Sequence, residues 1–265
     1  MKAAFRRRGD DATEDSEKPF IEHLEDLRST IIQCMVFLGL GVIVAIPLTP
    51  WILDVLSLPV AWIGRDPAVF LKIIRVAGGF VLATRVAVWS GVLFSAPFLV
   101  WAIAGFVFPG LTRREKRVIR RTGALATGLF VAGVVFCYFT TLPVTLQMML
   151  GLNSWMGKPT DFVEFSDYIG FALNLLLGFG LAFELPVVLM ALGSVGVVTA
   201  AGLRRTWRYA VVIILIVAAV LTPPDVFSQV LMAGPLLLLY EMGVWLVRMQ
   251  ERAAARREDP SLRSG

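Results

Sequence analysis

Six stretches of the chain lack charged residues almost completely, and they constrain its fold more than any other feature. The first covers residues 29 to 53, and these 25 residues exceed the roughly 20 apolar residues that cross a hydrocarbon core. The others cover residues 86 to 112, 122 to 158, 168 to 203, 209 to 221 and 226 to 240. With 57% hydrophobic and 17% charged residues and a mean hydropathy of +0.75, a soluble protein is excluded. The sequence predicts an all-α polytopic membrane protein with six transmembrane helices.

Two details concern the lengths of these helices. Pro143 is expected to end the third helix, because proline cannot continue a helical hydrogen-bond pattern. The fifth and sixth stretches hold only 13 and 15 uncharged residues, and a 13-residue helix is only about 20 Å long. Helices five and six are therefore predicted to be short, with a thinner bilayer beside them.

The distribution of basic residues predicts the orientation. Twenty of the 25 Lys and Arg residues lie in the segments 1–28, 113–121, 204–208 and 248–263, all on one side of a six-span topology. The positive-inside rule places that side, with both termini, in the cytoplasm. This placement also explains the net charge of +5 without nucleic acid as a partner.

Three regions follow from this topology. Residues 1–28 form a cytoplasmic N-terminal segment with an amphipathic helix, residues 29–248 form the six-span membrane domain, and residues 249–265 form a disordered cytoplasmic tail. The longer external segments, about 54 to 76 and 143 to 167, contain aromatic residues and are expected to fold as a cap.

Several kinds of chemistry are excluded by composition. Cys34 and Cys137 both lie in apolar stretches, so neither a disulfide framework nor a paired-cysteine metal site is expected. His23 is the only histidine, which leaves no histidine-rich metal site and no histidine-based catalytic pair. We expect no cofactor and no enzymatic activity.

Acids near the first span allow two interpretations. Between residues 20 and 31 apolar residues recur at helical spacing, while Glu22, Glu25 and Asp26 lie largely elsewhere around the helix. The helix could simply rest on the membrane surface with its carboxylates in water. Alternatively, the acids bind a cationic partner, because a guanidinium group pairs bidentately with a carboxylate. Glu115, set among bases, is open to the same two interpretations.

Glu184 interrupts the fourth apolar stretch and is followed by Pro186. A charge at the centre of a bilayer costs from about 2.5 to more than 10 kcal/mol, so such a residue is protonated, paired or exposed to water. A functional polar site near a helix distortion is therefore predicted here.

Four segments together resemble the TatC family, the multi-spanning receptor subunit of the twin-arginine protein translocase. They read Pro-Phe-Ile-Glu-His-Leu-Glu-Asp-Leu-Arg at 19–28, Phe-Val-Phe-Pro-Gly-Leu at 106–111, Phe-Glu-Leu-Pro-Val at 183–187 and Leu-Thr-Pro-Pro-Asp-Val-Phe-Ser-Gln at 221–229. The resemblance implies a glove-like, concave six-helix bundle in the bacterial cytoplasmic membrane. It also implies binding of twin-arginine signal peptides of folded proteins, self-association, and assembly with single-span TatA/TatB-type subunits for export driven by the proton-motive force.

The resemblance also implies roles for individual residues. The signal-peptide region would comprise Glu25, Asp26, Arg28, Phe106 and Glu115. Glu184 would be the intramembrane docking site, and Pro59, Asp225 and Gln229 would act on the external face. Asp26 stands where the family usually has Glu, so Asp26, Glu25 and Glu22 are alternative main contacts for the arginines.

An alternative function is a proton-coupled small-molecule transporter that uses Glu184 as its relay. The absence of an internal repeat speaks against it. An intramembrane enzyme is less favoured, because the sequence has no HExxH motif and no paired membrane aspartates.

Overall fold

The structure is a computed structural model that describes residues 18–107, 116–194, 196–221 and 226–258. Its elements in chain order are α1 (Lys18–Trp62), α2 (Pro67–Phe70), β1 (Leu71–Lys72), α3 (Gly78–Val107), α4 (Lys116–Phe136), the π-helix η1 (Cys137–Thr141), α5 (Leu142–Trp155), β2 (Val163–Glu164), α6 (Phe165–Ala182), α7 (Leu185–Ser194), α8 (Ala200–Arg205), α9 (Trp207–Leu221) and α10 (Val226–Glu258).

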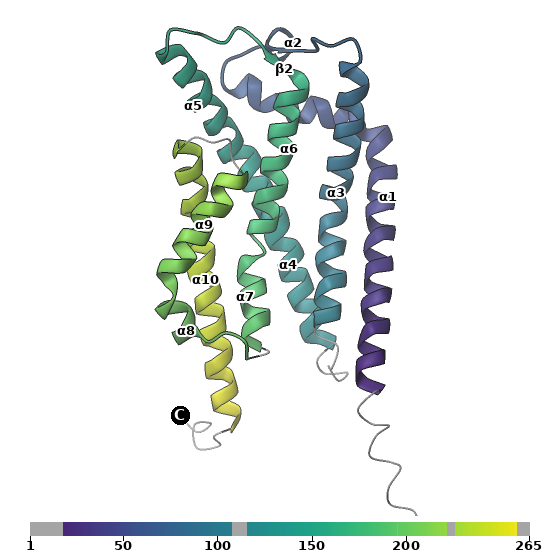
Figure 1. The fold of residues 1–265 in the computed structure, drawn as a ribbon, viewed down its shortest axis with the longest axis vertical. Helices are drawn as coiled ribbons and strands as arrows, with labels where there is room; N and C mark the ends of the chain where they lie inside the picture. Colours follow the sequence, from purple (N-terminus) through teal and green to yellow (C-terminus); the bar gives the residue numbers. More distant parts are fainter. Residues whose placement is uncertain (1–17, 108–115, 195, 222–225, 259–265) are drawn as a thin grey trace, which may run out of the picture.

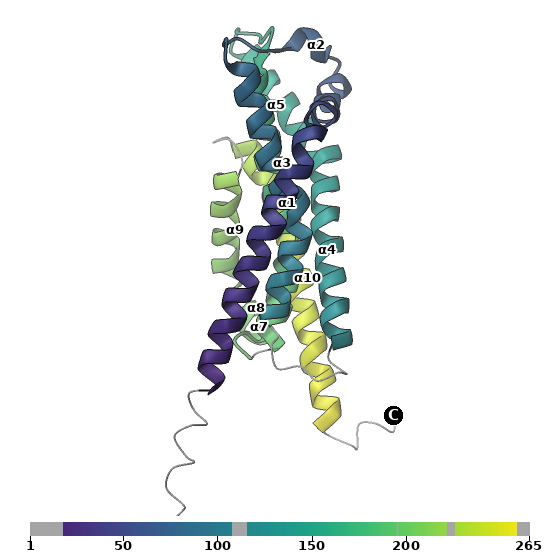
Figure 2. The ribbon, with the colours of Figure 1, turned by 90° about the vertical axis from the view of Figure 1, so that its right-hand side faces the viewer.

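The predicted six-span, all-α architecture is confirmed. In the described part of the chain, five helical stretches are long and apolar enough to cross a membrane, and Trp207–Val220 forms a shorter one. The start of α1 and the end of α10 lie at the same end of the bundle, here called the terminal end (Figures 1 and 2). The opposite end carries α2, β1 and β2 and is called the capped end (Figure 1).

Helix α1 differs from the prediction at both ends. The amphipathic segment is not a separate surface helix but the first turns of one continuous helix, Lys18–Trp62. The same helix continues past residue 53 through Pro47, Pro50 and Pro59, and its last part turns across the bundle near the capped end (Figure 1). Proline bends a helix without always ending it, which explains why α1 turns without ending.

Pro143 does not end the third span, contrary to expectation. The π-helix η1 ends two residues before it, and the backbone N–H of Leu142 donates to the carbonyl of Cys137, five residues earlier. This wider turn shifts the hydrogen-bond register where proline supplies no donor. The helical stretch therefore runs from Gly123 to Trp155.

The predicted short length holds for the fifth helix but not for the sixth. The short fifth helix is confirmed, whereas α10 is 33 residues long, so the prediction of a short sixth helix was wrong. The predicted disordered tail was also wrong for residues 249 to 258, which are helical; the rest of that tail lies outside the described residues. The reason is that isolated charges such as Glu241 do not end a helix, and the following Met, Gln, Glu, Arg and Ala residues favour it.

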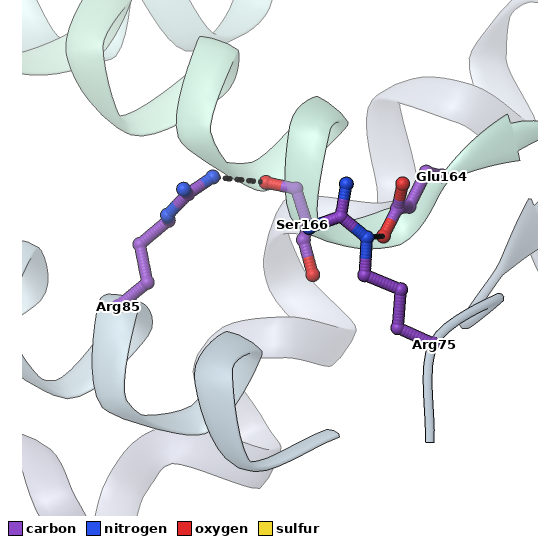
Figure 3. Close-up of polar contacts among 4 residues, drawn as sticks. All are labelled: Arg75, Arg85, Glu164 and Ser166. Carbon is purple, nitrogen blue, oxygen red and sulfur yellow. Dashed lines mark hydrogen bonds and ion pairs between the residues drawn. The ribbon is translucent and has the colours of Figure 1, made fainter. Parts of the chain in front are cut away.

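The external segments form the expected cap. Strands β1 and β2 pair in parallel, Leu71 with Val163 and Lys72 with Glu164. Two arginine contacts lie beside this pair (Figure 3): Nε of Arg75 lies 3.8 Å from Oε1 of Glu164, and a guanidinium nitrogen of Arg85 donates to the carbonyl of Ser166 at 2.8 Å. Arg75 thus ties the segment between β1 and α3 to β2, and Arg85 ties α3 to the first turn of α6.

Helix α6 lies at the centre of the protein core. Three of its large side chains, Ile169, Leu175 and Phe179, are completely buried. It contacts α1, α3, α4 and α9, so these four helices pack around it.

Helices α1 and α3 pack through two glycines, Gly41 on α1 and Gly91 on α3. A Cβ atom added to Gly91 would lie 2.6 Å from the Cα of Val42 on α1, closer than carbon atoms approach without a backbone shift. Small residues at such positions let membrane helices approach closely.

We therefore expect Gly91→Ala to destabilise the protein by about 1–3 kcal/mol, the usual cost of overpacking. Thermal unfolding in detergent micelles measures this. Gly39→Ala on α1 is the control, because an added Cβ there meets nothing within 4 Å. Equal melting temperatures for the two variants would contradict the close packing of α1 on α3.

Candidate functional site

The terminal end brings together the elements that carry the predicted signal-peptide residues. Glu25, Asp26 and Arg28 lie on the first turns of α1, and all three are exposed. Phe106 belongs to the last turn of α3, which ends at the same end of the bundle (Figure 1). Glu115 lies outside the described residues, immediately before α4 begins at Lys116.

The carboxylates of Glu25 and Asp26 are available to a partner. The ion pairs within the described part of the chain are Arg75–Glu164 and Arg204–Glu241, so neither carboxylate is paired with a described base. On a helix, residues 22, 25 and 26 share one face, because positions three and four apart are neighbours. The described side chains of Glu25 and Asp26 therefore lie side by side and exposed on α1.

Glu184 lies where the fourth span is broken. Its N–H donates to the carbonyl of Leu181 three residues back, and its own carbonyl accepts from Val188, so α6 ends and α7 begins around it. Pro186 provides no N–H for the carbonyl of Ala182. The predicted helix distortion at Glu184 is present.

The carboxyl group of Glu184 lies inside the protein. The residue is only 6% exposed, and its Oε1 has no hydrogen-bond partner among the described residues. On one side, a Cβ on Gly133 of α4 would lie 2.7 Å from the ring of Phe183; on the other, a Cβ on Gly243 of α10 would lie 3.2 Å from Pro186. Glu184 thus sits between two close helix contacts rather than at the lipid surface.

At the capped end, Pro59 acts together with a residue that the sequence did not reveal. Because proline has no N–H, the carbonyl of Val55 four residues earlier loses its helical donor. The hydroxyl of Tyr138, from η1, donates to that carbonyl at 2.6 Å. Pro59 is buried, so the proline and the tyrosine together fix the last part of α1.

A second tyrosine supports the same segment. The hydroxyl of Tyr168, on α6 and 2% exposed, donates to the carbonyl of Leu56 at 2.7 Å. Beneath this segment lies an apolar cavity of about 240 Å³, whose lining includes Trp51, Val55, Ser90, Phe94 and Tyr138. Both tyrosines lie in apolar stretches, where the sequence gives no sign of their roles. The one available signal is Pro59, whose missing N–H means that the carbonyl of Val55 needs another donor, here Tyr138.

The remaining external residues lie near the turn between α9 and α10. The side-chain amide of Gln229 donates to the carbonyl of Leu215 at 3.0 Å, which ties α10 to α9. Asp225 lies outside the described residues. The described residues contain no group of three or more His, Cys, Asp or Glu side chains that could hold a metal ion.

Comparison with known proteins gives the family. The profile described as Sec-independent protein translocase protein (TatC) matches residues 22–235. The chain belongs to the TatC family. It is therefore the TatC component of the twin-arginine translocase and not an enzyme, and this decides against the transporter hypothesis.

Individual relatives agree with this assignment. The chain is 36% identical over 236 residues to the Sec-independent protein translocase protein TatC of Carboxydothermus hydrogenoformans, covering 89% of this chain and 95% of that protein. It is 35% identical to the TatC of Deinococcus radiodurans, covering 87% of this chain and 86% of that protein. TatC homologues thus match nearly the whole membrane domain, and they are bacterial.

Solved structures confirm the fold. A crystal structure of the twin-arginine translocase receptor TatC in DDM superposes with a TM-score of 0.76 at 32% identity, covering 84% of this chain and 98% of that one. A second crystal structure of this receptor gives a TM-score of 0.74 at 30% identity, with coverage of 86% and 98%. The TatC fold is therefore the fold of this chain.

The pairing of Pro59 with Tyr138 can be tested by a double-mutant cycle. We expect Tyr138→Phe to destabilise the protein by about 1 kcal/mol, because a buried carbonyl loses its donor. In a Pro59→Ala background the restored N–H serves Val55, so the same change costs less. Unfolding of the four proteins in micelles gives the coupling. Tyr209→Phe, at an exposed tyrosine of α9, is the control, and additive losses would refute the pairing.

Proposed function

We propose that this TatC protein binds twin-arginine signal peptides of folded proteins at its terminal end. The supporting observation is the pair of exposed acids on α1, Glu25 and Asp26, at the end where α3 ends and α4 begins. A guanidinium group offers a planar set of donors that matches a carboxylate, so closely spaced acids suit two adjacent arginines. In this proposal Glu25, Asp26 and Glu115 supply the counter-charges, while Arg28 and Phe106 complete the surface.

This site faces the cytoplasm in the proposed orientation. Most of the Lys and Arg residues belong to segments at the terminal end. The positive-inside rule assigns that end to the cytoplasmic side of a bacterial inner membrane. A signal peptide on a protein folded in the cytoplasm would therefore reach these acids before any part of it crosses the membrane.

Further partners belong to the same proposal. The protein associates with single-span TatA/TatB-type subunits and with other copies of itself, and export is driven by the proton-motive force. Glu184 is the proposed docking point, because an unpartnered carboxyl oxygen in an apolar interior is costly until a donor reaches it. A polar side chain on a partner helix would provide that donor.

The signal-peptide site predicts selective losses of affinity. Glu25→Ala, Asp26→Ala and Glu115→Ala should each weaken binding of a twin-arginine peptide up to about five-fold, the upper range for an exposed ion pair. Combined changes should cost most, and their ranking identifies the main contact. A peptide with two lysines should also bind worse, because ammonium lacks the planar donor set.

Fluorescence anisotropy of a labelled peptide on detergent-solubilised protein measures these affinities. Asp54→Ala is a matched control, because Asp54 is an exposed acid on the same helix α1 but near the capped end. If the Asp54 variant and the triple variant bind alike, the site is elsewhere.

Docking at Glu184 predicts a graded response. Glu184→Gln keeps a hydrogen-bonding group of similar size, so most export should persist, whereas Glu184→Ala should impair export without weakening signal-peptide binding. Export of a folded reporter and peptide binding are measured side by side. Equal and complete loss of export in both variants would instead indicate that Glu184 exchanges a proton.

A further inference from the structure

One face of α10 carries a stripe that changes from apolar to basic toward the terminal end. Residues 238, 241, 245, 248 and 252 follow spacings of three and four and therefore share one helix face. Leu238 is 75% exposed and Trp245 58% exposed. Arg248 and Arg252 continue the stripe and are exposed, and neither is paired with a described acid. We call Leu238, Glu241, Trp245, Arg248 and Arg252 the α10 stripe.

The neighbouring helix α8 adds bases to this stripe. Nη2 of its Arg204 lies 3.8 Å from Oε2 of Glu241, and both side chains are more than half exposed. The hydroxyl of Tyr240 also donates to the carbonyl of Leu203 at 2.8 Å. The end of α8 is thus held against α10, and Arg205 and Arg208, both exposed, follow directly.

The second acid nearby is occupied elsewhere. Oε1 of Glu251 accepts the backbone N–H of Ala200 at 2.9 Å, where the start of a helix favours a negative charge. Glu241 is balanced by Arg204, and Glu251 by the start of α8. The charges of Arg248 and Arg252 are therefore not compensated within the described part of the protein.

We propose that the α10 stripe, together with α8, is a binding site for one anionic phospholipid of the cytoplasmic leaflet. Arg248 and Arg252 hold the phosphate, Trp245 lies at the level of the glycerol, and Leu238 contacts an acyl chain. This order along one helix face follows the order of groups in a phospholipid. Basic clusters between membrane helices on the cytoplasmic side suit anionic headgroups, and tryptophan prefers the same interface.

The stripe favours a lipid over two other anions. A soluble acidic segment would use the arginines but has no reason to follow an exposed leucine toward the middle of the span. A free phosphate ion would use neither Trp245 nor Leu238. This inference is independent of the signal-peptide proposal, because none of its residues belongs to that site.

The test measures lipid binding to the full-length protein in detergent micelles. Protein is titrated with phosphatidylglycerol or phosphatidylcholine, and bound lipid is counted by native mass spectrometry. We expect the wild type to prefer phosphatidylglycerol. Arg248→Gln combined with Arg252→Gln should weaken its binding about 30-fold, since each arginine near an anionic surface contributes about five-fold, and should leave phosphatidylcholine binding unchanged.

Glu241→Gln should have the opposite effect. It removes the acid that balances Arg204, so phosphatidylglycerol should bind about five-fold more tightly. A control pair, Arg65→Gln with Lys158→Gln, removes two exposed bases from the capped end and should change nothing. Unchanged signal-peptide affinity in every variant verifies that the fold is intact.

Three results would overturn the proposal. The first is equal loss of phosphatidylglycerol binding in the control pair, which would indicate a nonspecific effect of net charge. The second is displacement of the lipid by excess inorganic phosphate, which would indicate a site for the free ion. The third is binding of an acidic soluble peptide that needs the same arginines and excludes the lipid, which would indicate a protein partner.

Discussion

Backbone carbonyls inside a membrane must find donors within the protein, and the prolines of this chain show what happens where a donor is missing. Pro59 removes the donor for Val55, and the hydroxyl of Tyr138 replaces it. Pro143 follows a π-helical turn that shifts the hydrogen-bond register. Pro186 coincides with the break between α6 and α7, where Glu184 lies. The bend over the capped end, the irregular third span and the break in the fourth span are thus three consequences of one constraint.

Charge placement divides the protein into two ends with different chemistry. At the capped end, three of the described bases are engaged: Arg75 pairs with Glu164, Arg85 binds the carbonyl of Ser166, and Lys72 lies over the ring of Phe162. At the terminal end, exposed acids on α1 and exposed bases on α10 are left available. The three contacts at the capped end hold structure together, while unpaired charges at the terminal end can recognise partners of opposite sign.

Hydrophobicity and charge predicted the number of spans, the short fifth helix and the break at Glu184, because each depends on local sequence. Helix ends predicted from a charge or a proline were wrong. Glu241 lies within α10 and Pro143 follows η1 without ending the helical stretch. The roles of Tyr138 and Tyr168 depend on hydrogen bonds to residues that are 83 and 112 positions away in the sequence, respectively. No local pattern encodes such contacts. The acids at the terminal end could be named from motifs, but their lack of described ionic partners required the structure.

The unexpected length of α10 has a consequence for how the terminal end works. A helix that stopped at residue 240 would leave Trp245, Arg248 and Arg252 without a common face. Because α10 continues to Glu258, these residues align below an apolar surface. Glu251 can also reach the start of α8 only because the helix continues past it. Helix α10 also fixes the end of α8, since Arg204 and Leu203 of α8 both contact α10. One uninterrupted helix therefore organises the surface of the terminal end on the side of the bundle formed by α8, α9 and α10.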